Sequence, residues 1–148
     1  MAADIIYQNL IRDKTSEKEV LYSYSYNLIH FKKENDAISF LKKLEMYDKK
    51  NYMIFYLLGL AFFKLKNFDL AEKYYLQAIN KNKNKNSEEI FSNLGNCYLE
   101  MNMTERAIDC YNNSLKIKPN NKSALNNLAS LSYFNNNIKE AEKLYSLS

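Results

Sequence analysis

Few residues in this sequence could do acid–base, thiol or metal chemistry. His30 is the only histidine of the 148 residues, so paired-histidine zinc sites are excluded and a catalytic triad would depend on this one imidazole. It falls near the end of an expected helix, where a partly exposed structural histidine is the simpler interpretation. The neighbouring carboxylates Glu88 and Glu89 begin another expected helix, where the helix dipole stabilises negative charge. The sequence therefore predicts neither an enzyme nor a metal site.

The two cysteines, Cys97 and Cys110, are expected on the two helices of one hairpin, opposite each other across its turn. We interpret them as small buried side chains, because thiols stay reduced inside cells and free cysteine packs as a small hydrophobe. A redox-sensitive crosslink between them is the alternative.

Glycine is scarce, which limits both the chemistry and the fold. Gly59 and Gly95 are the only glycines, so the sequence contains neither a P-loop nor a dinucleotide-binding fingerprint, and we expect no cofactor. With a single proline as well, the composition argues against sandwiches and barrels and leaves long stretches able to form helices. The predicted fold class is all-α.

An internal period shows how these helices are organised. Five alanines stand 34, 34, 36 and 34 residues apart: Ala3, Ala37, Ala71, Ala107 and Ala141. A bulky residue follows each of them by four positions: Tyr7, Leu41, Tyr75, Tyr111 and Tyr145. Small and bulky residues at i and i+4 lie on one helix face, and a fixed period of this size indicates stacked helical hairpins.

Applied to the whole chain, the period predicts one array over residues 1–148. It consists of a half-repeat helix at 2–13 and repeats at 18–51, 52–87, 88–121 and 122–148. The eighth position of each repeat is small, where two helices could approach closely: Ser25, Gly59, Gly95 and Ala129. Asparagine is expected to replace glycine in the left-handed turn positions of the hairpins, at Asn35, Asn67, Asn102 and Asn135 to Asn137.

The residues that recur at fixed positions of the four repeats resemble the tetratricopeptide repeat (TPR), whose pattern is W-x2-L-G-x2-Y…A-x3-F…P. Repeat 88–121 matches it through Phe91, Leu94, Gly95, Tyr98, Ala107, Tyr111 and Pro119. Repeat 52–87 matches nearly as well, and 18–51 and 122–148 are looser. The resemblance implies a right-handed α-solenoid of stacked helix-turn-helix hairpins, acting as a non-catalytic protein–protein interaction module or scaffold.

In this family the first helix of each repeat lines a concave groove. Carried onto this sequence, the resemblance implies a groove that binds an extended or helical peptide through Tyr22, Tyr26, Tyr56, Leu57, Leu60, Phe63, Asn93, Asn96 and Asn127. Its first part is apolar and rich in tyrosine, which supplies large contact area at low entropic cost. In its second part asparagine dominates, and an amide can both donate to and accept from a peptide backbone.

Other occupants and roles remain open. The groove could be covered by the chain's own terminus or by a neighbouring copy. The alternative function is that of a structural unit that self-associates into a homo-oligomer through exposed repeat ends. A fragment that regulates an enzyme is the third possibility. The clamp by which related domains hold chaperone C-termini needs lysines and an arginine, and only Asn93 of this sequence fits it, so we predict against that ligand.

The net charge, the apolar stretches and the N-terminal sequence indicate which partners and which location to expect. The net charge of +4 is mild, and the lysines fall in expected loops and helix ends rather than in a stripe with stacking aromatics, so no nucleic-acid partner is expected. The longest apolar stretch is too short for membrane insertion, and no secretion signal begins the sequence. We expect a soluble protein that is cytoplasmic or otherwise intracellular.

Overall fold

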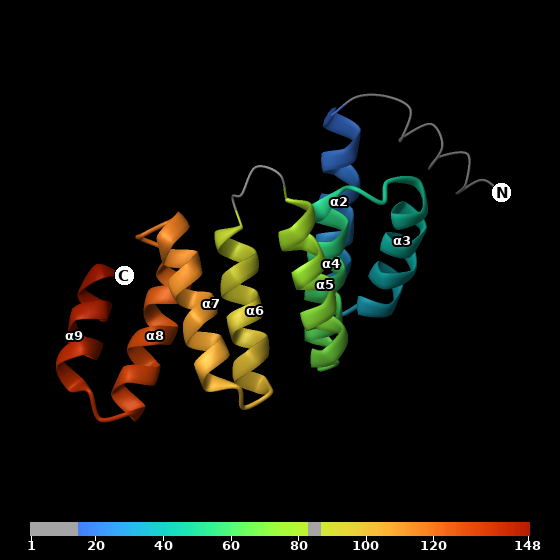
Figure 1. Ribbon diagram of the computed structural model, residues 1–148. Helices are drawn as coiled ribbons and strands as arrows, with labels where there is room; N and C mark the ends of the chain where they lie inside the picture. The colour runs from blue at the N-terminus through green and yellow to red at the C-terminus, as the bar shows by residue number, and fades with distance from the viewer. Residues whose placement is uncertain (1–14, 83–86) are drawn as a thin grey trace. The chain divides into compact units, whose positions relative to one another are not determined.

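The computed structural model describes residues 15–82 and 87–148, and every described element of regular structure is a helix (Figure 1). The helices are α2 (Thr15–His30), α3 (Glu34–Tyr47), α4 (Tyr52–Lys64), α5 (Phe68–Lys81), α6 (Glu88–Glu100), α7 (Thr104–Ile117), α8 (Lys122–Phe134) and α9 (Ile138–Leu147). The chain divides into unit 1, which ends at Lys81, and unit 2, which begins at Asn82.

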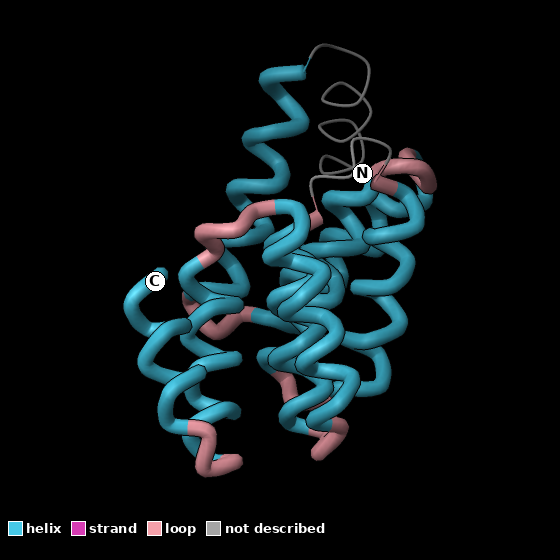
Figure 2. Tube along the Cα trace, turned by 60° about the vertical axis from the view of Figure 1, so that its left-hand side comes forward, coloured by secondary structure: helices cyan, strands magenta, loops and turns pink. Residues whose placement is uncertain are grey.

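Consecutive helices pack as hairpins: α2 with α3, α4 with α5, α6 with α7, and α8 with α9. The predicted all-α class built from helix-turn-helix hairpins is confirmed, and Figure 2 shows the short loops that join the helices. The right-handed winding and the single array over residues 1–148 stay predictions, because the helices cluster into two compact units. The half-repeat helix expected at 2–13 lies outside the described residues.

The same turn closes every described hairpin. Its left-handed residue comes five positions before the periodic alanine, and φ is 59° at Lys32, Lys66 and Asn102 and 61° at Asn136. In α4–α5, the amide of Lys66 donates to the carbonyl of Phe63 and that of Asn67 to the carbonyl of Phe62, both at 2.9 Å. These two bonds define the Schellman motif, which satisfies the last carbonyls of the first helix.

The expectation of left-handed asparagine is confirmed at Asn102 and within Asn135 to Asn137 but wrong at Asn35 and Asn67. In the first two hairpins a lysine takes that conformation. The position is set by where the first helix ends and which amides close the turn, so backbone hydrogen bonding outweighs the preference of the side chain.

Close contact between small and bulky residues holds each hairpin together. The described alanines of the period are buried, with 0% exposure at Ala37, Ala71 and Ala107 and 2% at Ala141. A Cβ atom on Gly59 would lie 2.5 Å from the Tyr75 ring, and one on Gly95 would lie 2.6 Å from the Tyr111 ring. The two glycines are therefore needed because a tyrosine ring from the second helix occupies the space where a side chain would begin.

In unit 1, α4 is the central helix, because α2, α3 and α5 all pack against it. Its residues from Ile54 to Gly59 are buried without a break. Aromatic rings fill the space toward α5, where Phe62 stacks on Tyr74 with ring centroids 5.4 Å apart. Position in the bundle thus makes α4 a core helix rather than an amphipathic one.

In unit 2, α6, α7, α8 and α9 pack each on the next. Cys97 and Cys110 are both buried in its first hairpin, and no disulfide joins them. Their burial agrees with the interpretation of both residues as small apolar side chains.

Candidate functional site

The residues predicted to bind a partner from unit 1 separate into exposed and buried ones. Tyr26 is 51% exposed, and three more are half-buried, namely Tyr22, Leu60 and Phe63. Tyr56 and Leu57 were predicted to face a ligand, but they are only 8% and 2% exposed. The reason is the central position of α4, which is surrounded by three helices. Buried side chains offer no surface to a partner, so the candidate face of unit 1 reduces to the other four residues.

A hydrogen bond holds the hydroxyl of Tyr22, which accepts from the side-chain amide of Asn51. Asn51 in turn caps α4, because its side-chain oxygen accepts from the backbone amide of Met53 at 3.1 Å. Burial, followed by the nearby charge of Asp48, raises the pKa of Tyr22 to about 12. Tyr22 is therefore a neutral, positioned ring at the edge of this face.

In unit 2 the predicted asparagines lie on α6 and α8, and two of them are joined. The side-chain oxygen of Asn96 accepts two hydrogen bonds, from the Tyr111 hydroxyl at 2.7 Å and from the Asn127 side-chain amide at 2.8 Å. Burial raises the pKa of Tyr111, so its hydroxyl stays protonated and donates. These bonds link α6, α7 and α8 and fix both amide groups in place.

The fixed amides keep hydrogen-bonding capacity. Within the described structure, the side-chain nitrogen of Asn96 donates to no residue and the side-chain oxygen of Asn127 accepts from none. One remaining donor and one remaining acceptor match the C=O and N–H groups of a peptide backbone. Asn93 and Asn127 share the sixth repeat position, but the observed bond joins Asn127 to Asn96 instead.

Asn93 lines a cleft of about 640 Å³ in unit 2. The cleft is formed by the first turns of α6 and α8 and the loop before α8, with Glu88, Glu89, Ser92, Asn93, Lys118, Asn120, Asn121, Lys122 and Ser123 around it. Its lining combines amides and hydroxyls with charges of both signs. Such a surface suits a polar chain segment rather than a single small ion.

A buried polar cluster that sequence reasoning missed lies beside this cleft. Ser114 donates to the carbonyl of Glu88 at 2.7 Å, lies 2.9 Å from the Ser92 hydroxyl, and accepts from Asn121 at 3.0 Å. Ser92 and Ser114 are 2% and 0% exposed. The one available signal was a serine at position 114, where the preceding repeat has Ala78. The cluster ties α6, α7 and the start of α8 together beneath the cleft.

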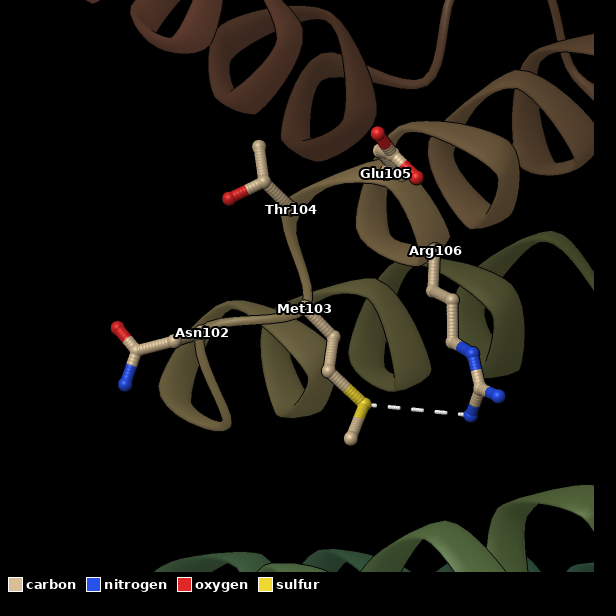
Figure 3. Close-up of a pocket in the computed structure, with 5 residues that line it drawn as sticks. All are labelled: Asn102, Met103, Thr104, Glu105 and Arg106. Carbon is tan, nitrogen blue, oxygen red and sulfur yellow. Dashed lines mark hydrogen bonds between the residues drawn. The ribbon is translucent and has the colours of Figure 1, made fainter.

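A second hollow in unit 2, of about 420 Å³, belongs to one turn of the chain. Figure 3 shows Asn102, Met103, Thr104, Glu105 and Arg106 around it, with the guanidinium of Arg106 3.9 Å from the sulfur of Met103. Because its five residues are two from the link between α6 and α7 and the first three of α7, it is an open turn surface separate from the predicted face. Among residues 15–82 and 87–148, no three His, Cys, Asp or Glu side chains gather as a metal site.

Comparison with known proteins identifies the repeats. Family models described as "Tetratricopeptide repeat" match residues 88–121 and 53–85, which correspond to α6–α7 and α4–α5. These are the two repeats whose residues fit the family pattern best.

The chain is also similar to a longer protein and to two solved structures. The chain is 34% identical over 110 residues to anaphase-promoting complex subunit CDC16 of Saccharomyces cerevisiae; the match covers 74% of this chain and 13% of that protein's length. A crystal structure of MamA superposes with a TM-score of 0.76 at 24% identity, covering 95% of this chain and 81% of MamA. A second MamA structure gives 0.73 at 26% identity, covering 87% and 69%. Among the described helices, none has the length and apolar character needed to cross a membrane.

Proposed function

The chain is a tetratricopeptide repeat protein, a protein-interaction module, and we propose that it holds an extended or helical segment of a partner protein on the first helices of its repeats. In unit 2 the contact residues are Asn93, Asn96 and Asn127. In unit 1 they are Tyr26 with parts of Tyr22, Leu60 and Phe63. The role is non-catalytic display of side chains, and the family is typically non-catalytic.

The pair of fixed amides in unit 2 carries this proposal. Tyr111 and Asn127 both donate to Asn96, at 2.7 and 2.8 Å, so the amides are oriented before any ligand arrives. An oriented group loses little conformational freedom on binding, which improves affinity. Because Asn96 keeps a donor for a C=O group and Asn127 keeps an acceptor for an N–H group, the pair reads the peptide backbone more than particular side chains.

The face of unit 1 contributes a different kind of contact. Tyr26 combines a half-exposed ring with a hydroxyl, and Leu60 and Phe63, which are predicted for the same face, are apolar. Tyrosine is enriched among residues that dominate binding energy, since it buries a large area with only two side-chain torsions. We assign to this face the bulky side chains of the same kind of ligand. An intracellular location stays a prediction.

The test is a selection of random twelve-residue peptides on the full chain, followed by affinity measurements on the enriched peptides. We expect Asn93→Ala with Asn127→Ala to weaken binding about tenfold, which corresponds to about 1.4 kcal/mol. The matched control, Asn112→Ala with Asn113→Ala, alters two asparagines of α7 outside the face and should bind like wild type. Equal affinity of both double variants, with helicity unchanged, would contradict the assignment.

Self-association is the second candidate, and exposed aromatic residues favour it. The α8–α9 hairpin presents Tyr133 at 59%, Phe134 at 83% and Ile138 at 42% exposure. Neighbouring exposed apolar side chains often mark a contact surface. Light scattering over a concentration series tests this role: we expect the mass to rise with concentration and Phe134→Ser to abolish the rise. A constant monomer mass would rule self-association out.

A further inference from the structure

Unit 1 contains a cleft of its own, formed mainly by α3 and α5, the second helices of its two hairpins. It has a volume of about 660 Å³ and is lined by Lys42, Glu45, Met46, Lys49, Phe55, Gln77, Asn80 and Lys81. Six of these residues belong to α3 and α5. The predicted partner-binding residues of unit 1 belong to α2 and α4 and do not line this cleft. It is therefore a separate surface from the face proposed above.

The cleft carries positive charge that its own residues leave unneutralised. Lys42 is already engaged, because it lies 2.7 Å from the carboxylate of Glu45 and donates to the Tyr74 hydroxyl. Lys49 and Lys81, in contrast, form no ion pair with any described residue. Two lysines thus remain to attract an anionic group, and a carboxylate or phosphate would form charge-assisted hydrogen bonds with them.

The rest of the lining combines two apolar side chains, Phe55 and Met46, with the amides of Gln77 and Asn80, and one acceptor among them is unsatisfied. Phe55 is only 3% exposed, and the ammonium of Lys81 lies 4.7 Å from the centre of its ring. Met46 is 74% exposed and supplies a flexible, polarisable side chain at the rim. The side-chain oxygen of Gln77 is buried and accepts no hydrogen bond from any described residue. A buried acceptor without a donor is costly, so a ligand that brings an N–H group gains by binding there.

We propose that this cleft binds an acidic segment of a partner protein, in which carboxylate side chains contact Lys49 and Lys81 and an apolar side chain packs on Met46. A backbone N–H of the segment donates to Gln77. A polypeptide supplies all three groups within a few residues. Nucleic acid fits less well, since binding of single strands uses exposed aromatic rings as stacking platforms, and the one aromatic ring of the cleft, Phe55, is buried beneath Lys81.

The experiment compares peptide selections from a random twelve-residue library on wild-type chain and on Lys49→Glu with Lys81→Glu. We expect one class of wild-type peptides to combine Asp or Glu with a bulky apolar residue and to be lost from the charge-reversed variant. For the best peptide of that class, labelled and followed by fluorescence polarisation, the variant should bind at least about tenfold more weakly, and wild-type affinity should fall as salt rises. The matched control is Lys33→Glu with Lys66→Glu, the same charge change on exposed residues of the hairpin turns, which should leave binding unchanged.

Two further variants separate this site from general effects. Gln77→Met removes the buried acceptor while keeping a side chain of similar volume. It should lower the affinity for the peptide severalfold without lowering thermal stability. Tyr26→Ser should leave this peptide's affinity unchanged, which distinguishes the cleft from the first-helix face. The proposal is overturned by selection without acidic enrichment, by equal loss in the control, or by an oligouridylate that binds the same lysines more tightly than the peptide.

Discussion

Unit 1 and unit 2 use the same hairpin but carry different side chains at equivalent positions of the first helix. The equivalent pairs of α4 and α6 are Tyr56 and Ser92, Leu57 and Asn93, and Leu60 and Asn96. In unit 1 the first two of these positions are apolar and buried within the bundle. In unit 2 they hold a hydrogen-bonded serine above Ser114 and an asparagine that lines a cleft.

The difference shows that the backbone and the recognition chemistry are set by separate residues. Gly59 with Tyr75 and Gly95 with Tyr111 make the same close contact in both units. The fifth, sixth and ninth positions differ instead, being apolar or aromatic in α4 and polar in α6. One scaffold can therefore present bulky apolar contacts in one unit and oriented amides in the other.

The largest effect is expected where the two units agree. Gly59→Ala and Gly95→Ala each place a Cβ within 2.5 to 2.6 Å of a tyrosine ring. Overpacking of this kind should lower the free energy of unfolding by about 1–3 kcal/mol in either unit. Urea denaturation measures the loss, and hydrogen exchange should locate it in the mutated hairpin. Tyr111→Leu should rescue Gly95→Ala, since the first hairpin has Ser25 and Leu41, both buried, at the equivalent positions. Wild-type stability of both glycine variants would refute the contact.

A smaller effect should separate the units by their interior polarity. Ser114→Ala copies the residue of unit 1 into unit 2 and removes the hydroxyl that bonds Ser92, Asn121 and the Glu88 carbonyl. We expect a loss of about 1–2 kcal/mol, because the part-buried side-chain amide of Asn121 loses its acceptor and Ser92 keeps only the Glu88 carbonyl. The reciprocal Ala78→Ser should also destabilise, since Ala78 is fully buried. If thermal unfolding is unchanged in Ser114→Ala, the serine cluster is not a stabilising feature of unit 2.

The tyrosine that orients the amide pair should have a moderate effect. Tyr111→Phe removes the 2.7 Å hydrogen bond to Asn96 while keeping the ring against Gly95. We expect the free energy of unfolding to fall by about 0.5–1.5 kcal/mol. The selected peptides that bind the asparagine face of unit 2 should also bind more weakly. Side-chain amide resonances of Asn96 and Asn127 should shift in an NMR spectrum. Unmoved resonances would show that the two amides are not coupled to this hydroxyl.

The smallest effect is a pH dependence carried by one tyrosine in each unit. Burial raises the pKa of Tyr22 from its ordinary value of 10.0 to about 12, and burial also raises the pKa of Tyr111. The folded state holds these protons more tightly than the unfolded state, so the stabilisation is complete below pH 10 and is lost as pH rises toward 12 and beyond. Tyr22→Phe and Tyr111→Phe should each flatten this alkaline decline. A decline equally steep in the double variant would assign it to other groups.

Much of the fold could be predicted from the sequence, because it depends on contacts that repeat. Ala71 and Ala107 recur at the period and are buried, and Gly95 marks a close approach between helices, as its small size indicated. Such positions are informative because only small residues fit there. The left-handed lysines were missed, since the end of the helix rather than the residue type determines that conformation.

The candidate site was less predictable, because it depends on packing between helices distant in sequence. Leu57 matches the family pattern of a groove residue, yet it is buried because three helices surround α4. The bond between Asn96 and Asn127 joins residues 31 apart, and no spacing rule indicates it. The lysine-bordered cleft beside Gln77 likewise arises only when α3 and α5 are placed together.

The left-handed lysines also bear on how this protein could be engineered. Lys32 and Lys66 hold φ at 59°, a conformation that glycine adopts without the steric cost that a side chain imposes. Lys32→Gly and Lys66→Gly should therefore each raise the free energy of unfolding by about 0.5–1 kcal/mol, which a thermal denaturation series would measure. Neither residue belongs to the predicted contact set or lines a cleft. The protein can thus be stabilised at two exposed hairpin turns, and its binding surfaces can be redesigned independently.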